Sequence, residues 1–448
     1  MTEKIAPRVP RGMRDILPEK NILRQYVIGQ IRQVFEAFGF EPLETPAVEL
    51  WETLMGKYGP EAEKLIYEVQ HRGGKERLAL RYDLSVPLAR VVAQYPHLPK
   101  PFRRYQIAPV WRAERPQKGR YREFYQCDAD IVGSASMLAD AEVIHLIYEV
   151  LQRLGFRAFT IHINHRKLIT GLGQFAGVPQ DLLGGLYRAV DKWERIGPEG
   201  VRDELLKARV PQEAAERLLG LLQGTQGPSR AVLQALRAQM ASYQVALEGI
   251  AQLEELIGYL EALEVPEAAY RVDVSMVRGL EYYTGPVYET TVEEPRIGSI
   301  TGGGRYDGLV GLFSEQSLPA TGTTLGIERI IDVMEELQMY PPNLGGTVVQ
   351  VLVAHFGAGT LPAALRLARD LRRAGWPTEL YYEEARVGDQ IRYALRKGIP
   401  FVAILGPDEV ASGAASLRNL GTQEQVTVPL EDVVPRLEAW QAARTTAT

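Results

Sequence analysis

The segment 123–132 constrains the fold most, because its alternation gives a strand one polar face. Successive side chains of a β-strand point to opposite faces. Four residues therefore share one side of this strand: Phe124, Gln126, Asp128 and Asp130. A row of amide and carboxylate groups is unusual on a strand that faces a hydrophobic core, and it suits the floor of a pocket. We therefore expect a sheet that gives part of one face to a polar site.

A basic segment comes just before this strand. Residues 105–112 also have the pattern of a strand, and 113–122 form the loop between the two strands. Between 101 and 122 only Glu114 is acidic, whereas seven side chains are basic: Arg103, Arg104, Arg112, Arg115, Lys118, Arg120 and Arg122. The whole chain has a formal net charge of −5, which argues against a surface coated for non-specific nucleic-acid binding. Because these basic residues alternate with apolar ones, we interpret them as an anion site.

Length and composition set the broad class. A chain of 448 residues is expected to form two or three domains, and 46% hydrophobic with 24% charged residues is typical of a soluble globular protein. We find no apolar run of the roughly 18 residues that a membrane helix needs, and no signal-peptide core at the start. The single cysteine, Cys127, excludes an intrachain disulfide and a cysteine-based zinc cluster. A cytoplasmic location is expected.

The histidines do not form a metal-ligand pattern. There are six: His71, His97, His145, His162, His165 and His355. His162 and His165 fall on opposite faces of a predicted strand, so structural histidines are the better interpretation. We expect no metal held by a cage of protein side chains.

Changes in composition divide the chain into segments. Residues from about 172 to 265 are rich in Leu, Ala, Glu and Arg, and they lie between two strand-like segments of one sheet. We interpret them as a helical insertion into a core domain. The expected segments are 1–171 (first part of the core), 172–265 (insertion), 266–339 (second part of the core), 340–346 (linker) and 347–448 (a further domain).

The last segment has the pattern of an α/β domain. Strand-like runs at 347–354, 377–382 and 400–405 alternate with helical stretches at 360–374 and 387–397. Such alternation predicts a largely parallel sheet. Its 11 basic and 11 acidic residues from 346 onward balance, so composition does not indicate a nucleic-acid binder.

Local signals organise the first hundred residues. Apolar residues at three-to-four spacing predict a helix over 23–38. Prolines in the extended segment 40–50 place it at a sheet edge or an interface. A hairpin is expected where 65–69 and 78–81 flank two glycines. A helix should then begin near Ser85, with that serine as its N-cap.

The eight residues Arg278–Gly285 are unusually dense in functional groups. They hold an arginine, a carboxylate, two tyrosines and two glycines. Such groups are costly to bury unless each has a partner, so we expect a site for a small, polar, planar ligand beside an anion. The segment Gly302–Gly308 follows a predicted strand at 298–301. It lacks the spacing of a P-loop or a dinucleotide fingerprint, so alone it indicates little.

Together these segments resemble class II aminoacyl-tRNA synthetases, and specifically the histidyl-tRNA synthetase family. Three are similar to the class-defining motifs: 40–50 around Pro46, 111–114 with its loop and Phe124, and Gly326–Arg329. Two more resemble signatures of the histidyl enzymes: Arg278–Tyr283 and Gly303–Gly308. The resemblance covers nearly the whole chain and is weakest across the insertion. Glu281 stands where aspartate is commoner and Ser85 where threonine is commoner, and both keep the chemical type.

The resemblance implies a fold and an activity. The fold would be an α+β catalytic core, with an antiparallel sheet flanked by helices, a helical insertion that contacts tRNA and a C-terminal α/β anticodon-binding domain. The activity would be that of a histidine–tRNA ligase. It would use ATP with Mg²⁺ to form histidyl-adenylate from L-histidine, and would then load tRNA(His). A homodimer is also implied.

The first step needs charge neutralisation rather than a general base. The carboxylate of the amino acid is already ionised when it attacks the α-phosphate, and planar, permanently charged guanidinium groups suit the charge that grows on the phosphoryl oxygens. Arg112 and Arg278 are the predicted catalytic residues. The resemblance further assigns the outer phosphates to Arg120, Arg122 and Arg329, with adenine stacked on Phe124 and Glu114 near its amino edge.

The amino-acid pocket must satisfy an ammonium group and an imidazole. Asp83, Ser85 and Gln126 can accept hydrogen bonds from the ammonium group. Asp130 can accept from the imidazole N–H, while Tyr283 donates to the other nitrogen. The remaining residues assigned to histidine binding are Leu84, Arg112, Arg278, Tyr282 and Tyr306. A site built from such groups rejects analogues that lack them by about 10⁴–10⁵, so no editing domain is expected.

A different function remains as the alternative. A catalytically silent paralogue of these synthetases serves as the regulatory subunit of ATP phosphoribosyltransferase. Such paralogues generally lack the anticodon domain and parts of the ATP motifs. This chain has residues 346–448 and the three arginines Arg112, Arg278 and Arg329, so the ligase is the favoured interpretation.

Overall fold

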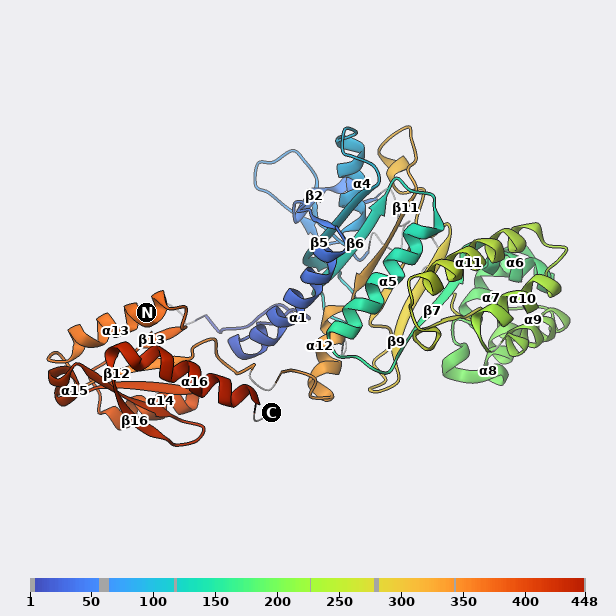
Figure 1. The fold of residues 1–448 in the computed structure, drawn as a ribbon. Helices are drawn as coiled ribbons and strands as arrows, with labels where there is room; N and C mark the ends of the chain where they lie inside the picture. The colour runs from blue at the N-terminus through green and yellow to red at the C-terminus, as the bar shows by residue number, and fades with distance from the viewer. Residues whose placement is uncertain are drawn as a thin grey trace. The chain divides into compact units, whose positions relative to one another are not determined.

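A computed structural model describes residues 5–55, 64–116, 119–225, 227–277, 282–341 and 344–446. The chain divides into two compact units, which are described separately (Figure 1). The first contains residues 1–14 and 27–339, and the second contains 15–26 and 340–448. No helix among the described residues has the length and apolar character needed to cross a membrane.

An eight-stranded sheet forms the centre of the first unit. Its spatial order is β1-β5-β6-β11-β10-β9-β7-β8. The strands are β1 (Glu41–Pro42), β5 (Phe102–Trp111), β6 (Glu123–Val132), β7 (Phe159–His165), β8 (Tyr270–Val272), β9 (Pro286–Val292), β10 (Thr301–Arg305) and β11 (Ala320–Leu325). The expected antiparallel sheet is confirmed for every neighbouring pair along the spatial order β5-β6-β11-β10-β9-β7. The outermost pairs, β1 with β5 and β7 with β8, are parallel, so the whole sheet is mixed.

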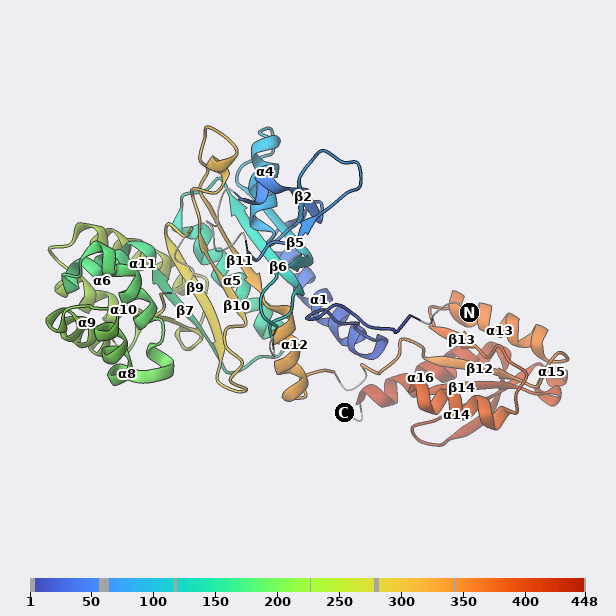
Figure 2. The ribbon, with the colours of Figure 1, turned by 180° about the vertical axis from the view of Figure 1, so that it is seen from behind.

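Helices cover one face of this sheet. Helix α5 (Met137–Arg153) packs against β11, and α12 (Ile327–Glu336) packs against β6. Figure 1 shows α5 lying across the strands, and Figure 2 shows the sheet from the side away from it. On β6 the buried residues Cys127, Ala129 and Ile131 alternate with the polar row predicted from the sequence. Period-two alternation therefore turns the polar row away from the apolar face.

A small second sheet is formed by strands from the first hundred residues. Its order is β2 (Val48–Leu50), β4 (Leu78–Leu80) and β3 (Glu68–Val69), which confirms the predicted hairpin. Helix α1 (Pro18–Ala37) is confirmed, and β1 and β2 lie at sheet edges as their prolines predicted. The predicted N-cap is wrong, because α4 (Ser85–Gln94) includes Ser85 as its first residue. The Asp83 carboxylate instead accepts a hydrogen bond from the Val86 N–H, at 3.0 Å.

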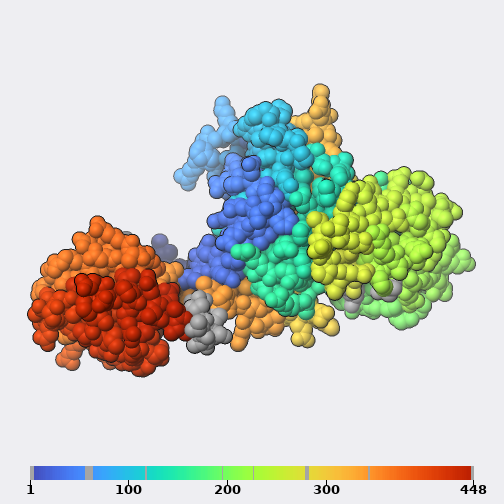
Figure 3. Space-filling model, in the orientation of Figure 1, coloured from blue at the N-terminus to red at the C-terminus, as the bar shows by residue number. Residues whose placement is uncertain are grey.

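Among the described residues between the adjacent parallel strands β7 and β8, the chain forms six α-helices. They are α6 (Arg166–Ala176), α7 (Leu183–Val190), α8 (Trp193–Lys207), α9 (Gln212–Gly224), α10 (Ser229–Gln239) and α11 (Gln244–Ala262). Helix α11 packs on both α6 and α5, which joins the helical segment to the core. Figure 3 shows these helices, in green to yellow, gathered at one end of the first unit. A parallel strand pair requires a crossover, and this segment provides it.

The second unit holds a five-stranded sheet in the order β13-β12-β14-β15-β16. Its strands are β12 (Val351–His355), β13 (Thr378–Leu380), β14 (Phe401–Leu405), β15 (Ala414–Asn419) and β16 (Gln425–Pro429). Its helices are α13 (Leu361–Arg373), α14 (Val387–Lys397), α15 (Pro407–Ser412) and α16 (Val433–Thr446). The α/β alternation is confirmed.

The expectation of a largely parallel sheet in this unit holds only for β13, β12 and β14. Strands β15 and β16 are antiparallel to their neighbours. The physical reason is the length of the connection after β14. It contains only the short helix α15 and a left-handed glycine, Gly413, with φ 66°. A parallel crossover needs about a dozen residues or more, so the chain reverses instead.

Candidate active site

Two neighbouring cavities lie over the polar side of the eight-stranded sheet in the described part of the first unit. The arginine-lined cavity has a volume of about 350 Å³, and its polar lining includes Arg112, Glu114, Arg120, Tyr121, Glu289, Thr324, Glu328 and Arg329. The carboxylate cavity has a volume of about 250 Å³, and its lining includes Asp83, Ser85, Asp128, Asp130, Tyr282, Tyr283 and Tyr306. Arg112, Gln126, Gly302 and Thr324 line both, so these four residues mark the boundary.

Arg112 occupies this boundary because it follows directly after the last residue of β5. Its backbone N–H donates to the Arg122 carbonyl at 2.9 Å, and its Nε donates to the Tyr82 carbonyl at 3.2 Å. The guanidinium carbon lies 4.4 Å from the centroid of the Tyr82 ring and 5.1 Å from that of Phe124. Stacking against aromatic rings suits a planar guanidinium and fixes its orientation.

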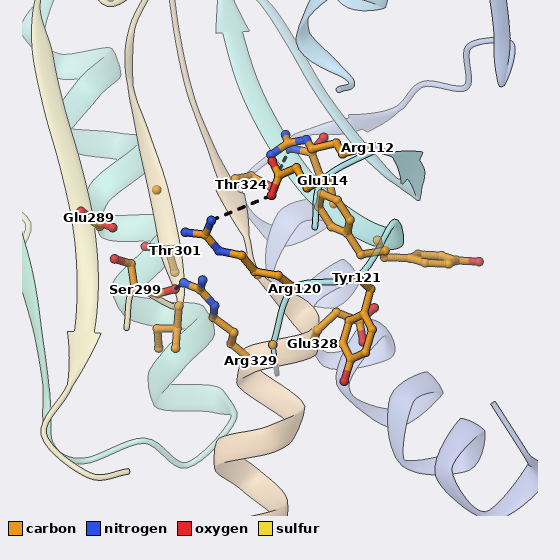
Figure 4. A pocket seen from close by; sticks show the side chains of 17 residues that line it. Arg112, Glu114, Arg120, Tyr121, Glu289, Ser299, Thr301, Thr324, Glu328 and Arg329 are labelled. Carbon is orange, nitrogen blue, oxygen red and sulfur yellow. Dashed lines mark hydrogen bonds and ion pairs between the residues drawn. The ribbon is translucent and has the colours of Figure 1, made fainter. Parts of the chain in front are cut away.

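The other cations of the arginine-lined cavity come from the loop after β5 and from the start of α12. Arg120 lies 3.9 Å from Glu114, and its side chain is 55% exposed. Arg329 donates from Nη1 to the Ser299 carbonyl at 2.6 Å. Figure 4 shows the Arg120 and Arg329 head groups pointing to the same side of the cavity, towards Ser299, Thr301 and Glu289. This arrangement offers positive charge to an extended anion.

Arg122 points elsewhere, although its backbone borders the same loop. Its Nε donates to the Glu114 carbonyl at 3.0 Å and its Nη1 to the Arg11 carbonyl at 3.3 Å. Its backbone N–H bonds to the Gly12 carbonyl at 2.9 Å. Gly12 has φ 86°, and a Cβ there would lie 2.9 Å from Arg122. The side chain thus holds the N-terminal turn against the loop.

A buried ion pair forms the floor of the carboxylate cavity. Arg104 on β5 and Asp130 on β6 are register partners, and Arg104 Nη2 lies 2.8 Å from Asp130 Oδ2. The two side chains are 0% and 4% exposed. Arg104 also donates to the Leu84 carbonyl at 3.1 Å, and the Tyr306 hydroxyl donates to Asp130 Oδ1. These contacts hold Asp130 in one orientation.

Glycines allow the strands to approach this carboxylate. A Cβ at Gly322, which faces Asp130 across β11 and β6, would lie 2.0 Å from Asp130 Oδ1. A Cβ at Gly303 would lie 2.3 Å from the Gly322 carbonyl oxygen. The glycine run 302–304 is therefore part of strand β10, whereas the sequence predicted a strand that ended at 301. Gly303 and Gly304 are glycines because neighbouring backbones leave no room for a Cβ there, whereas a Cβ at Gly302 would meet open space.

Asp128 lies between Gln126 and Asp130 on the polar face of β6. It is 3% exposed, and its Oδ1 has no hydrogen-bond partner among the described residues. Burial, which disfavours the charged form, is the largest cause that raises the pKa of Asp128 to about 7. Arg104 opposes this rise in pKa, and the neighbouring carboxylate of Asp130 adds to it.

Three phenols complete the wall. The Tyr282 hydroxyl donates to the Tyr283 hydroxyl at 3.0 Å, and the two ring centroids lie 4.3 Å apart. Burial raises the pKa of Tyr283 to about 12, and it raises the pKa values of Tyr282 and Tyr306 well above 10. All three are therefore neutral phenols at physiological pH and keep an O–H to donate.

Comparison with known proteins decides the family. Residues 12–330 match the family model of histidyl-tRNA synthetase, and residues 349–440 match the model of an anticodon binding domain. The chain belongs to the histidyl-tRNA synthetase family. Family membership makes it an aminoacyl-tRNA ligase. The predicted fold class is confirmed as well, with the mixed catalytic sheet and the separate C-terminal sheet described above.

Individual relatives agree over nearly the full length. The histidine–tRNA ligase of Aeropyrum pernix is 45% identical, and the match covers 96% of this chain and 98% of the relative. A crystal structure of histidyl-tRNA synthetase from Nostoc sp. superposes with a TM-score of 0.86 at 33% identity, covering 97% of this chain and 100% of that one. A structure from Bacillus halodurans, described as an ATP phosphoribosyltransferase regulatory subunit/histidyl-tRNA synthetase, has a TM-score of 0.73. It is 23% identical over 90% of this chain and 99% of that one, so it shows a shared fold alone.

The structure brings most of the predicted site residues of this synthetase-family chain together. Residues that line one or both cavities are Asp83, Ser85, Arg112, Glu114, Arg120, Phe124, Gln126, Asp130, Tyr282, Tyr283, Tyr306 and Arg329. Leu84 and Arg122 are not among the lining residues; Leu84 is fully buried and presents its carbonyl to Arg104. Arg278 and Glu281 lie outside the described residues.

Four residues at or beside the cavities were given no ligand-binding role from the sequence: Arg104, Asp128, Glu289 and Thr324. Period-two alternation placed Asp128 on the predicted pocket floor, and only its role was left unassigned. Arg104 was counted in the predicted anion site, but its partner Asp130 depends on the register between β5 and β6, which the sequence did not predict. Glu289 and Thr324 lie on β9 and β11, and only the order of the strands brings them to the cavity.

Proposed function

We propose that this chain activates L-histidine with ATP to give histidyl-adenylate and then transfers the histidyl group to tRNA(His). The observation that carries the proposal is the continuous row on β6. Phe124 lines only the arginine-lined cavity, Gln126 lines both, and Asp130 lines only the carboxylate cavity. The strand thus runs under the arginine-lined cavity and the carboxylate cavity in turn, with Arg112 at their boundary. The two reactants of an adenylation would meet there.

At that boundary the amino-acid carboxylate attacks the α-phosphorus and pyrophosphate leaves. The carboxylate oxygen forms the new P–O bond as the bond to the pyrophosphate oxygen breaks, and no proton has to move. Arg112 neutralises charge on the α-phosphoryl oxygens, and its aromatic neighbours keep it in place before substrate arrives. Arg278, outside the described residues, is proposed as the second guanidinium.

ATP would occupy the arginine-lined cavity. Adenine stacks on Phe124 with Glu114 at its amino edge, and Arg120 and Arg329 bind the outer phosphates. Arg122 acts through the loop, which it anchors to the N-terminal turn.

Magnesium fits this cavity as a companion of the nucleotide. Among the described residues, no three or more His, Cys, Asp or Glu side chains form a cluster that could hold a metal. Three carboxylates line the cavity, and with Glu114 assigned to the adenine edge, Glu289 and Glu328 are left. Mg²⁺ commonly takes one or two carboxylates together with phosphate oxygens and water, so these two glutamates would hold it. Its contribution would be to neutralise phosphate charge.

Histidine would occupy the carboxylate cavity. Asp130 accepts from the imidazole N–H, and Tyr283, as a neutral phenol, donates to the other ring nitrogen. Tyr282 and Tyr306 form the walls, and Asp83, Ser85 and Gln126 accept from the ammonium group. Discrimination would follow from buried polar groups that an analogue leaves unpaired, so the first binding step would suffice without editing.

The remaining segments would serve the tRNA. We propose the domain limits 1–171 and 266–339 for the core, 172–265 for a tRNA-contacting insertion, 340–346 for a linker and 347–448 for the anticodon-binding domain. The match of 349–440 to an anticodon binding domain supports the last assignment. We further propose a cytoplasmic homodimer that uses the proline-containing edge segment 40–50 at its interface. The regulatory-paralogue alternative is disfavoured by the full-length match to histidine–tRNA ligases.

The test is ATP–pyrophosphate exchange on the full chain with each of the twenty amino acids. Exchange that depends on histidine alone, followed by loading of tRNA(His) transcript, would support the proposal. Exchange with another amino acid would reassign the pocket. Absence of exchange with all twenty, in a folded protein, would favour the regulatory paralogue.

A further inference from the structure

The carboxylate cavity contains more carboxylates than buried cations in the part of the chain that the structure describes. Asp83, Asp128 and Asp130 all line it. Arg104 is the fully buried arginine beside them, and its ion pair is with Asp130. Asp83 Oδ1 is used by the backbone of α4. Asp128 Oδ1 is buried without a hydrogen-bond partner, which is costly unless a ligand supplies one.

The groups around Asp128 come from every element that packs against it. They are Arg104 on β5, Asp130 on the same strand, Thr324 on β11, Asp83 before α4, and the phenols Tyr283 and Tyr306. Residues 278–281 lie outside the described part. This environment raises the pKa of Asp128 to about 7, chiefly by burial. A cation placed beside the carboxylate would oppose that effect and release the proton.

The order of groups on β6 indicates which part of the substrate meets Asp128. Side chains two residues apart on one face of a strand are roughly 7 Å apart. Gln126, Asp128 and Asp130 therefore lie at increasing distances from the boundary between the cavities. In histidine the α-nitrogen is two bonds from the carboxylate carbon, and the ring nitrogens are four and five bonds away. With the carboxylate at Arg112, the ammonium group comes next, beyond Gln126 along the strand, and the imidazole comes last.

We propose that Asp128 binds the α-ammonium group of the amino-acid substrate directly, through its unpartnered Oδ1, and so selects for ligands that carry a cation at that position. This inference rests on the proposed function. It adds a second buried carboxylate to the acceptors Asp83, Ser85 and Gln126. Asp130, tied to Arg104 and Tyr306, is left for the imidazole ring.

The experiment compares three ligands on the full-length wild type and on Asp128→Asn. Histidine has both charged groups, histamine lacks the carboxylate, and imidazolepropionate lacks the ammonium group. Each dissociation constant is measured by calorimetry. We expect the variant to bind histidine and histamine about tenfold to a hundredfold more weakly, as for the loss of a charged hydrogen bond. Binding of imidazolepropionate should stay within about twofold. An equal loss for all three ligands would overturn the proposal, because it would mean that Asp128 only shapes the cavity.

Asp130→Asn is the matched control, since it removes a carboxylate two residues away on the same face. All three ligands carry the imidazole ring, so this variant should weaken all three to a similar extent. If Asp130→Asn instead spares imidazolepropionate while Asp128→Asn does not, the two aspartates have exchanged roles and the proposal is overturned.

A second measurement needs no variant and stays informative if Asp128→Asn fails to fold. Calorimetry of the wild type at pH 7 in two buffers of different ionisation enthalpy gives the protons released on binding. After subtraction of the proton that each free ligand carries on its own imidazole at pH 7, histidine and histamine should release more protons than imidazolepropionate, because the ammonium group displaces the proton from an Asp128 carboxyl with pKa about 7. Equal release by all three ligands would overturn the proposal. Failure of the proposed function would be recognised separately, as wild-type protein without histidine-dependent exchange.

Discussion

The two cavities of the first unit hold their charges in opposite ways. In the arginine-lined cavity the cations come from a loop and from a helix start. The Arg120–Glu114 pair spans 3.9 Å, with side chains 55% and 31% exposed. In the carboxylate cavity the charges are on central strands, and the Arg104–Asp130 pair is almost fully buried at 2.8 Å. One site is exposed and adaptable, and the other is fixed before any ligand arrives.

The difference fits the ligands proposed for each cavity. A nucleotide arrives with a large charge, Mg²⁺ and bound water, and exposed arginines on a loop can close around it without a large desolvation penalty. A small amino acid must be distinguished from others of similar size. Buried groups with fixed orientation give the larger discrimination, because a wrong ligand leaves them unpaired.

The largest expected effect is on folding stability. Arg104→Met removes one partner of the buried pair and leaves Asp130 without it, so the free energy of unfolding should fall by about 3–5 kcal/mol. The matched exposed variant, Arg120→Met, should change it by less than about 1 kcal/mol. Urea unfolding followed by tryptophan fluorescence measures both. Equal losses for the two variants would remove the contrast between the cavities.

The next effect is on the chemical step at the boundary. Arg112→Ala should slow adenylate formation by about 10²–10³, the scale for loss of a donor aimed at developing charge. Arg112→Lys keeps the charge but loses the stacking on Tyr82 and Phe124, so its rate of adenylate formation should lie between those of the wild type and Arg112→Ala. Rapid-quench single-turnover measurements give these rates. A rate for Arg112→Ala close to wild type would exclude a role in the transition state, and Arg278→Ala is tested in the same way.

The third effect separates the two ligands. Tyr283→Phe should raise the KM for histidine about fivefold to tenfold, as for one lost neutral hydrogen bond, and should leave the KM for ATP unchanged. Arg329→Ala is the reciprocal variant, which should raise the KM for ATP and spare histidine. Pyrophosphate exchange at varied histidine and ATP gives both constants. Parallel changes in the two constants would mean that the cavities are not independent ligand sites.

The same comparison explains what the sequence could predict. The polar face of β6 was predictable because side-chain alternation is a local property of one strand. The order and relative direction of the strands depend on the lengths of the connections between them. The connection after β14 is short, so β15 is antiparallel to β14, whereas the sequence predicted a largely parallel sheet. Glycines 302–304 were taken as the segment after a strand, because glycine alone does not reveal that neighbouring backbones approach Gly303 and Gly304.

Side-chain partners were harder to predict than positions. Arg104 and Arg122 belong to the same basic segment, and both were counted towards one anion site. The structure gives Arg104 a buried carboxylate on the neighbouring strand and gives Arg122 the carbonyls of Glu114 and Arg11. The partner of Arg104 depends on how two strands pair, and the partners of Arg122 depend on the path of a loop. The periodicity of the sequence gives no information about either.

The smallest expected effect tests whether the exposed cavity needs support from the N-terminal turn. The Arg14 guanidinium carbon lies 3.6 Å from the Tyr121 ring centroid, and Arg14 also forms an ion pair with Glu328. Tyr121 and Glu328 both line the arginine-lined cavity, on the loop and on α12 (Figure 4). Arg14→Leu should raise the KM for ATP about twofold to fivefold, in line with the loss of one cation–π contact, and leave that for histidine unchanged.

Arg14→Lys provides the control, because lysine keeps the charge for Glu328 and loses the planar stacking on Tyr121. A KM for ATP near the wild-type value in Arg14→Lys would show that the ion pair is the part that matters. An unchanged KM in Arg14→Leu would mean that the loop holds its shape without the N-terminal turn. The adaptable cavity would then depend on its own loop and helix alone, whereas the carboxylate cavity depends on the sheet.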